Sequence, residues 1–330
     1  MSARVLVSGA NGFVGSAVVR ALLRHGYAVR ALVRASSDTR NLDGLDAEIV
    51  HGDLLDPPSL ERALRDCRGL FHVAADYRLW ARDPARIRMT NVRGTRNILA
   101  VAMRSGIDRI VHTSSVATLG LHDDGTPADE DTSSRYADML GEYKRSKYLA
   151  EKMARRQAHA GHDIVIVNPA APVGPRDRKP TPTGRMILDA ARGRMPAFVD
   201  TGLCVVHVDD VAEGHVLAFE HGRSGRRYIL GGDNMSLKAI LAAVAQLTGL
   251  RGPWLKLPHA AVLPVAHVAE AWARISGQEP SVTVTGAQLA RHRMHFSSRR
   301  AETELGYRAR PAREALADAI EWFRDNGYLR

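Results

Sequence analysis

Three glycines that follow a short apolar run near the N-terminus constrain this chain more than any other feature. Residues 4–8 (RVLVS) have the pattern of a buried strand, and residues 14–26 carry apolar residues at helical spacing. Between them lie Gly9, Gly12 and Gly15, in a GxxGxxG spacing rather than GxGxxG. Glycines permit a tight turn and let a phosphate approach the backbone, while the helix N-terminus offers free N–H groups. We therefore predict a dinucleotide site; the alternative is a purely structural turn.

The same alternation of strand and helix continues through the first half of the chain. Strand patterns recur at 28–33, 47–50, 69–75, 109–115 and 163–168, with helical patterns near 58–66, 85–104 and 136–160. Buried strands separated by helices predict an α/β fold with a Rossmann-type, doubly wound parallel sheet. Residues 205–208 and 209–222 are expected to add one more strand and helix to that sheet.

The 330 residues exceed the ~250–300 at which a single core stops growing, so we expect a second, smaller domain. We assign residues 1–168 and about 203–225 to the dinucleotide-binding domain. Residues of about 169–202 and 226–330 form a mixed α/β substrate domain, with helices expected at 236–248, 259–276 and 311–325. The Pro-, Gly- and charge-rich stretch 168–185 is predicted to be a long functional loop or lid. The apolar segment 259–275 is either a packed helix or a wall for an apolar substrate.

Composition narrows the function classes. The net charge is +10, but the basic residues are dispersed and aromatic residues make up only 5%, which argues against nucleic-acid binding. Attraction of anionic small molecules and a merely solvated basic surface both remain open. With two cysteines, no signal-peptide pattern and no apolar run of membrane-spanning length, we expect a cytoplasmic protein. His159 and His162 have no evident third ligand, so no metal site is predicted.

Arg34 bears on the choice of cofactor. It ends the second predicted strand, 19 residues after Gly15, where an acid would hold the 2′-hydroxyl of NAD. A guanidinium instead matches the 2′-phosphate of NADP, so NADP(H) is favoured and NAD(H) stays possible. The alternative for Arg34 is a side chain that simply faces solvent. Asp53, which follows the next strand, is expected to accept a hydrogen bond from the adenine amine.

Tyr143 and Lys147 are four residues apart, which places them on one face of a helix. Ser115 ends a strand at the carboxyl edge of the sheet, where ligands of open α/β folds bind. A free phenol has a pKa of ~10, and lowering it by three units takes ~4 kcal/mol. One ammonium at ~4 Å supplies about that much at an effective dielectric of 20, and an oxidised nicotinamide adds a second positive charge. We therefore predict that Tyr143 transfers a proton, that Lys147 acidifies it and holds the nicotinamide ribose, and that Ser115 binds the reacting oxygen.

These motifs, with Gly52-Asp53-Leu54, His72-Val73-Ala74-Ala75, the segment 91–97 and His207-Val208-Asp209-Asp210, resemble the extended short-chain dehydrogenase/reductase family over essentially the whole chain. The resemblance implies that Ser115, Tyr143 and Lys147 form the catalytic triad. It also implies that Ala74 and the segment after Asn168 line the nicotinamide. The full set of expected cofactor contacts is Gly9, Asn11, Gly12, Phe13, Val14, Gly15, Arg34, Asp53, Leu54, Ala74, Ala75, Ser114, Tyr143, Lys147, Asn168 and Pro169.

Within that family, residues 29–34 look like the NADPH-using dihydroflavonol-reductase branch. Residues 74–80 and 179–184 resemble bacterial hopanoid-associated sugar epimerases, which implies a triterpenoid-lipid context and a sugar-like or polyol substrate. Dehydratases of the family carry an Asp-Glu pair where this chain has Val116 and Ala117, so elimination is not expected. We predict a reductase acting on a secondary alcohol or ketone. An epimerase with tightly bound NAD(P) and a non-catalytic cofactor-sensing protein are the alternatives.

Substrate contacts are expected from residues that follow two of the strands. Asp76, Tyr77, Arg78 and Trp80 come after the fourth strand, Asn168 ends the sixth, and Lys179 and Arg185 are placed to close over the site. The alternative for each is a solvated loop. The expected partner is a small molecule, a lipid-linked one included, and the family resemblance adds a possible homodimer.

Overall fold

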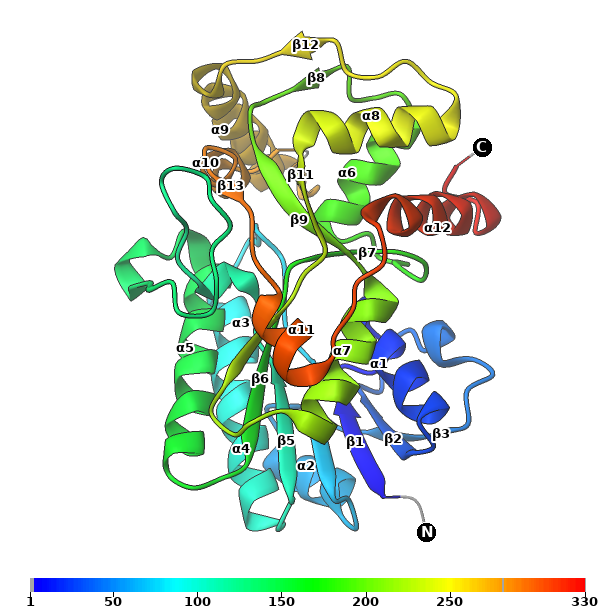
Figure 1. The fold of residues 1–330 in the computed structure, drawn as a ribbon, viewed down its shortest axis with the longest axis vertical. Coiled ribbons are helices and arrows are strands. Elements are labelled where there is room, and N and C mark those ends of the chain that lie inside the picture. Colours follow the sequence, from blue (N-terminus) through cyan, green and yellow to red (C-terminus); the bar gives the residue numbers. More distant parts are fainter. Residues whose placement is uncertain (1–2, 281, 330) are drawn as a thin grey trace.

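The protein is described by a computed structural model that covers residues 3–280 and 282–329. Seven parallel strands form its central sheet, in the order β10-β6-β5-β4-β1-β2-β3 (Figure 1). The strands are β1 (Arg4–Ser8), β2 (Ala28–Val33), β3 (Ala47–His51), β4 (Gly69–His72), β5 (Arg109–Thr113), β6 (Ile164–Pro169) and β10 (Arg227–Leu230). The predicted Rossmann-type, doubly wound fold is confirmed.

Alternate residues of each strand face opposite sides of the sheet, so the sheet has two cores. On β1, Val5 and Val7 join the core beneath α1 (Phe13–Arg24) and α7 (Val208–His221). Leu6 joins the opposite core, with α2 (Pro57–Leu64) and α4 (Gly94–Arg104). On that second side, α3 (Pro84–Arg88) runs through a π-helical turn (Met89–Arg93) into α4, and α5 (Gly141–His159) packs against them. The chain therefore reverses its direction of winding at β1, which has β2 on one side and β4 on the other. In such sheets the crevice at that point, outside the carboxyl ends of the strands, is where ligands bind.

A second, smaller group of elements lies beyond the carboxyl ends of the sheet (Figure 1). Its sheet is built on β9 (Gly202–His207), which pairs with β7 (Ala171–Val173), β11 (Asp233–Ser236) and β13 (Arg293–Met294). Short strands β8 (Ala197–Phe198) and β12 (Leu255–Lys256) pair with each other. The helices are α6 (Pro182–Ala191), α8 (Leu237–Thr248), α9 (His259–Ser276), α10 (Val284–Leu289) and α12 (Ala312–Asp325). A core of their apolar faces joins α6, α8 and α12.

The strand expected at 205–208 in the large sheet is wrongly placed. It belongs to β9 of the smaller sheet, whereas α7, which follows it, does pack on α1 as predicted. The seventh strand of the large sheet is instead β10, from the segment assigned to the substrate domain, and it pairs with β6 from Arg227 opposite Ile166. Short α11 (Arg299–Leu305) packs on α7 and β10, so a late segment also returns to the large sheet.

Two further expectations need correction. The stretch 168–185 is not one long loop, because it contains β7 and the first residues of α6. The helix at 259–276 is present with the predicted bounds, but it is not packed as a core helix: only Ala266 and Ala273 are buried. No helix among the described residues combines the length and apolarity that crossing a bilayer requires.

Candidate active site

One large cavity of about 1460 Å³ lies at the carboxyl ends of the central strands, between the sheet and the smaller group of elements. Most of the predicted site residues line it. They are Gly9, Asn11, Gly12, Phe13, Val14, Gly15, Arg34, Asp53, Leu54, Ala74, Ala75, Asp76, Tyr77, Ser114, Ser115, Tyr143, Lys147 and Pro169. The cavity thus joins the glycine loop to the predicted proton-transfer residues.

The glycine loop has the geometry that a pyrophosphate needs. Gly9 adopts a positive φ of 68°, and a Cβ there would lie 2.7 Å from the Ala74 Cα. At Gly15 a Cβ would lie 2.0 Å from the Gly9 carbonyl oxygen. At Gly12, which caps α1, a Cβ would meet only that same oxygen, at 3.2 Å, and otherwise occupy open space. The first and third glycines therefore let the loop pack, and the second keeps the approach to the helix N-terminus clear, so the loop fits a dinucleotide.

Just beyond the end of β2, a positive charge in the cavity would favour binding of an anion. Arg34 is exposed in the cavity and has no ion-pair partner among the described residues. The nearby acid, Asp38, is held by Arg40, whose Nη2 is 2.6 Å from the Asp38 carboxylate. This contact holds the pKa of Asp38 down, to about 2. Asp53 lines the cavity and accepts the Leu55 backbone N–H at 2.8 Å.

Three elements bring the predicted catalytic residues together. Tyr143 and Lys147 lie one turn apart near the start of α5, and Ser115 follows β5. The Ser115 hydroxyl caps a short 3₁₀ helix (Val116–Thr118) by accepting the Ala117 N–H at 3.1 Å. Lys147 Nζ donates to the Thr113 carbonyl at 2.6 Å. An ammonium has three N–H donors, so two stay available to the cavity.

Burial dominates the titration of both groups on α5. It raises the pKa of Tyr143, and the interaction with the Ser115 side chain opposes that rise. It lowers the pKa of Lys147 to about 8, against an opposing effect of the Glu151 carboxylate. In the protein without cofactor, the phenol of Tyr143 is therefore not acidic, and the predicted acidification counts on the charge of an oxidised nicotinamide as well as on Lys147. A further positive charge at the site is needed to acidify the phenol.

Glu151, which the sequence reasoning missed, lies one turn beyond Lys147 and is buried. One carboxylate oxygen accepts the Ser114 hydroxyl at 2.5 Å, the Thr118 hydroxyl at 2.7 Å and the Asn168 amide at 2.9 Å. Asn168 was predicted to line the cavity, and this is wrong. It is fully buried behind Ser115, whose carbonyl its amide also binds, at 3.0 Å. Because side chains alternate along β6, Asn168 points behind Ser115 whereas Pro169 reaches the cavity.

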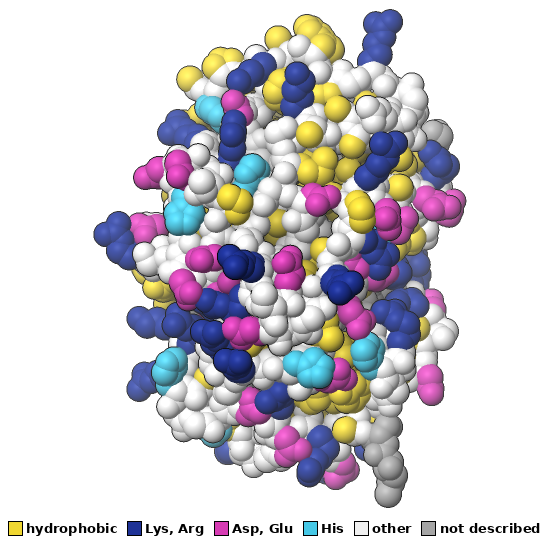
Figure 2. Space-filling view, in the orientation of Figure 1, with side chains coloured by type: hydrophobic (Ala, Val, Ile, Leu, Met, Phe, Trp, Pro, Cys, Tyr) yellow, Lys and Arg dark blue, Asp and Glu magenta, His cyan; other side chains and the backbone are white. Residues whose placement is uncertain are grey.

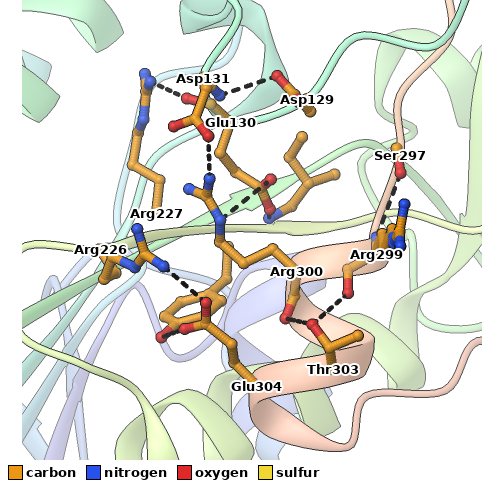
Figure 3. A network of polar contacts seen from close by, with 12 residues as sticks. Asp129, Glu130, Asp131, Arg226, Arg227, Ser297, Arg299, Arg300, Thr303 and Glu304 are labelled. Carbon is orange, nitrogen blue, oxygen red and sulfur yellow. Dashed lines mark hydrogen bonds and ion pairs between the residues drawn. The ribbon is translucent and has the colours of Figure 1, made fainter.

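The other oxygen of Glu151 links the site to distant segments. Arg227 of β10 lies 3.3 Å from it and also donates to the Glu130 carbonyl. Figure 3 shows the continuation: Arg300 of α11 reaches toward Glu130 and Asp131, and Arg226 pairs with Glu304 at 2.8 Å. The Glu130 carboxylate is itself buried and accepts the Ile229 N–H at 2.8 Å. The C-terminal segment therefore buttresses the layer behind Ser115 and Lys147.

Besides Asn168, two of the predicted substrate residues do not reach the cavity. Trp80 is absent from its lining, and Arg185 pairs with Glu279 at 3.0 Å outside it. Asp76 lines the cavity, but its carboxylate is bound by Arg78 at 2.5 Å. Tyr77 lines it as well and donates to the Lys179 carbonyl at 3.2 Å, which closes the cavity on that side.

The sequence reasoning also missed the far wall of the cavity. It is apolar and comes from elements distant in the chain, with Leu119, Leu121, Met186, Val199, Leu203, Leu289, Met294 and Phe296 in its lining. No local pattern marks these residues, because they meet only through the pairing of β13 with β9 and the packing of the segments around it.

The match with known proteins identifies the family. Residues 5–231 match the model of the NAD dependent epimerase/dehydratase family. The chain belongs to this family. It is thus an NAD(P)-dependent enzyme of the extended short-chain dehydrogenase/reductase type, as predicted.

Two relatives and one solved structure cover nearly the whole chain. A Synechocystis protein, whose name assigns it provisionally as a dihydroflavonol 4-reductase, is 47% identical and covers 98% of this chain and 95% of its own. Sterol demethylase protein B of Methylococcus capsulatus is 36% identical, over 98% of this chain and 99% of its own. The crystal structure of gox2253 is 51% identical, with a TM-score of 0.89 and 99% of both chains covered.

Proposed function

We propose that the protein is an NADP(H)-dependent reductase that transfers hydride to a ketone, or from the matching secondary alcohol, of a largely apolar molecule. The observation that carries this proposal is the single cavity that joins the glycine loop, Arg34, Tyr143 and an apolar wall. Hopanoid or other terpenoid-linked metabolism and a cytoplasmic location are compatible with it.

Arg34 supports NADP(H) over NAD(H). Its guanidinium has no ion-pair partner among the described residues, and Asp38, four residues further on, is paired with Arg40. A 2′-phosphate at this place would gain a charge-assisted, bidentate contact.

The proton step falls to the residues of α5 and β5. When bound, a nicotinamide cofactor supplies the hydride and, in its oxidised form, a positive charge. Tyr143 holds the proton at its phenol oxygen and gives it to the reduced carbonyl oxygen, while Ser115 donates a hydrogen bond to that same oxygen. Lys147, fixed by the Thr113 carbonyl, directs its two other N–H groups into the cavity. Val116 and Ala117 offer no acid or base for elimination of water.

The apolar wall supports a substrate with little charge. Two arginines of the lining, Arg78 and Arg176, are already paired with Asp76 and Asp209, which reduces what they offer to an anionic substrate. The relative named sterol demethylase protein B acts, by its name, on a sterol, which is such a molecule.

The decisive experiment replaces Tyr143 by Phe. We expect turnover of NADPH with apolar ketones to fall by about 10²–10⁴-fold, while NADPH binding, followed by its fluorescence, is retained. A variant that keeps the turnover rate would remove Tyr143 from the proton step.

Epimerisation, which the family's description includes, is the second candidate. It requires the hydride to return to the same molecule, and therefore a cofactor that stays bound. Nucleotide that co-purifies and survives dialysis would favour epimerisation, whereas free exchange of NADPH favours net reduction. If the protein only senses the cofactor, it should show no turnover, and Tyr143→Phe should leave its cofactor binding unchanged.

A further inference from the structure

Exposed apolar side chains gather at one end of the molecule. Of eleven exposed large hydrophobic residues in the described ranges, seven lie between residues 250 and 275. Figure 2 shows hydrophobic side chains at the upper end, where Figure 1 places α9 and β12. We call this the α9 face, with Leu250, Trp254, Leu255, Val265, Val268, Trp272 and Ile275 as its members. A cluster of exposed apolar side chains commonly marks an interaction site.

The orientation of α9 is the reverse of that of a core helix. Val265, Val268, Trp272 and Ile275 follow one another at intervals of three and four residues, so they form one stripe, and they are 58%, 71%, 63% and 78% exposed. The residues that α9 buries are the small Ala266 and Ala273 on its other side. The helix therefore packs through alanines and presents its largest apolar side chains outward.

The charged residues around the α9 face indicate which kind of partner would bind there. Residues 250–276, which contain the α9 face, include three basic residues, Arg251, Lys256 and Arg274, and one acidic residue, Glu270, and Lys256 is paired with Asp200 at 3.0 Å. Arg251 and Arg274 are exposed and have no ion-pair partner among the described residues. Two copies of this face would bring like net charges together, whereas an anionic surface complements them. Tryptophans, of which Trp254 and Trp272 are 74% and 63% exposed, suit the boundary between lipid and water.

We propose that the α9 face docks on a lipid bilayer that carries anionic headgroups. The apolar stripe of α9 lies in the plane of the interface, a few ångströms below the headgroups, and the flanking arginines contact their phosphates. Attachment is peripheral and reversible, because the buried part is one helix face and the adjoining strand.

The position of this face also connects it to the cavity. α10 packs against α9, and Gly286 and Leu289 of α10 line the cavity. A docked molecule would therefore hold the apolar end of its cavity near the bilayer, where a lipid-soluble ketone is concentrated. Only this last step rests on the proposed function; docking itself does not.

Vesicle co-sedimentation of the full-length protein tests the proposal without cofactor or substrate, so its failure is separate from failure of the proposed reductase. The probes are vesicles of phosphatidylcholine alone and of phosphatidylcholine with phosphatidylglycerol at about three to one. We expect binding to the mixed vesicles that weakens as salt is added. The double variant Trp272→Ser/Ile275→Ser should bind at least about tenfold more weakly, because it removes two large apolar side chains from the stripe.

The matched control is Ile49→Ser, which removes an exposed apolar side chain, 45% exposed, from β3. It should bind the mixed vesicles like the unaltered protein, and unchanged far-UV circular dichroism would show that both variants are folded. Unaltered protein that stays in the supernatant with mixed vesicles would overturn the proposal. So would a homodimer in gel filtration that the double variant dissociates, since the α9 face would then be covered by a second copy.

Discussion

The guanidinium of Arg34 differs from its neighbour at Arg40 in having no carboxylate beside it among the described residues. Arg40 makes bidentate contacts with Asp38, at 2.6 to 3.0 Å, and gains nothing from a ligand. The two arginines, six residues apart, therefore differ in their ion pairs, which the sequence does not show.

Replacing Arg34 by Ala should weaken NADPH binding by about 10–100-fold, because a hydrogen-bonded charge pair contributes ~1.5–3 kcal/mol. NADH binding should change little, since it has no 2′-phosphate. Fluorescence titration of both nucleotides measures this, with Arg40→Ala as the control. An equal loss for both nucleotides would mean that Arg34 supports the loop and does not select the cofactor.

Single residues also show where sequence reasoning stops. Tyr143, Lys147 and Ser115 could be predicted because helical spacing and strand ends place them at one edge of the sheet. Asn168 also ends a strand, but the pleat turns its side chain away from the cavity, and only the register of β6 shows which residue faces inward. The four-residue spacing of Tyr143 and Lys147 does not predict the pKa of the Tyr143 phenol, because burial raises that pKa.

The helix α5 acts as one unit in the site. It presents Tyr143, Lys147 and Glu151 at intervals of four residues, with Glu151 bonded to Ser114, Thr118, Asn168 and Arg227. The Glu151 carboxylate favours the charged form of Lys147, but burial still lowers the pKa of Lys147 to about 8, which ordinary assay conditions reach. Above that pH the ammonium is lost from the folded protein, so activity should fall on the alkaline side.

Glu151→Gln should move that alkaline fall to lower pH, because removing the carboxylate's charge lowers the pKa of Lys147 further. The pH profile of kcat/KM measures the shift, and Glu61→Gln, which alters an exposed ion pair with Arg104, is the matched control. Uniformly reduced activity with an unmoved profile would assign Glu151 to packing alone.

Whether a segment forms a helix or a strand could be predicted from the spacing of its apolar residues. Which sheet a strand joins could not, because that depends on the strands with which it pairs. The segments at 205–208 and 227–230 are both short and apolar, yet β9 joins the small sheet and β10 the large one. That choice depends on pairing between strands that are not neighbours in the chain, β10 with β6 and β9 with β7, β11 and β13, for which a single sequence carries no signal. The outward stripe of α9 is equally hidden, because periodicity shows that a helix has an apolar face but not what covers it.

At the scale of the whole molecule, three buried histidines sit on the layer that joins the sheet to its helices. His72 of β4 and His112 of β5 have rings 5.4 Å apart, and His215 of α7 bonds the Thr113 hydroxyl at 2.9 Å. Burial lowers the pKa of His72 to about 3 and of His215 to about 4, and it lowers the pKa of His112 well below its ordinary value. All three are therefore neutral in the folded protein at neutral pH.

These histidines make the fold sensitive to acid. In the unfolded chain they take up protons near pH 6.5. In the folded protein His72 and His215 exclude their protons until the pH falls to about 3 and about 4, and burial also holds the pKa of His112 well below its ordinary value. Between these values the unfolded state binds more protons, so the free energy of unfolding falls as the pH falls, by ~1.4 kcal/mol per pH unit for each proton. Asp177 opposes this, because burial raises its pKa to about 6 and the folded state then holds the extra proton between pH 6 and its ordinary value. Burial raises the pKa of Glu130 as well, so three histidines are opposed by two carboxyls, and unfolding near pH 5 should still take up protons on balance.

Urea unfolding at pH 7.5, 6 and 5 should show this decline in the free energy of unfolding. In His112→Leu the decline per pH unit should be smaller, by the amount that corresponds to about one proton. Neither ring nitrogen of His112 has a hydrogen-bond partner among the described residues, so the substitution removes a titrating group without leaving a polar partner unpaired. His25→Leu is the control, because that ring is 30% exposed beside Glu213. If His112→Leu unfolds with the same pH slope as the unaltered protein, the acid sensitivity lies elsewhere than in the buried histidines.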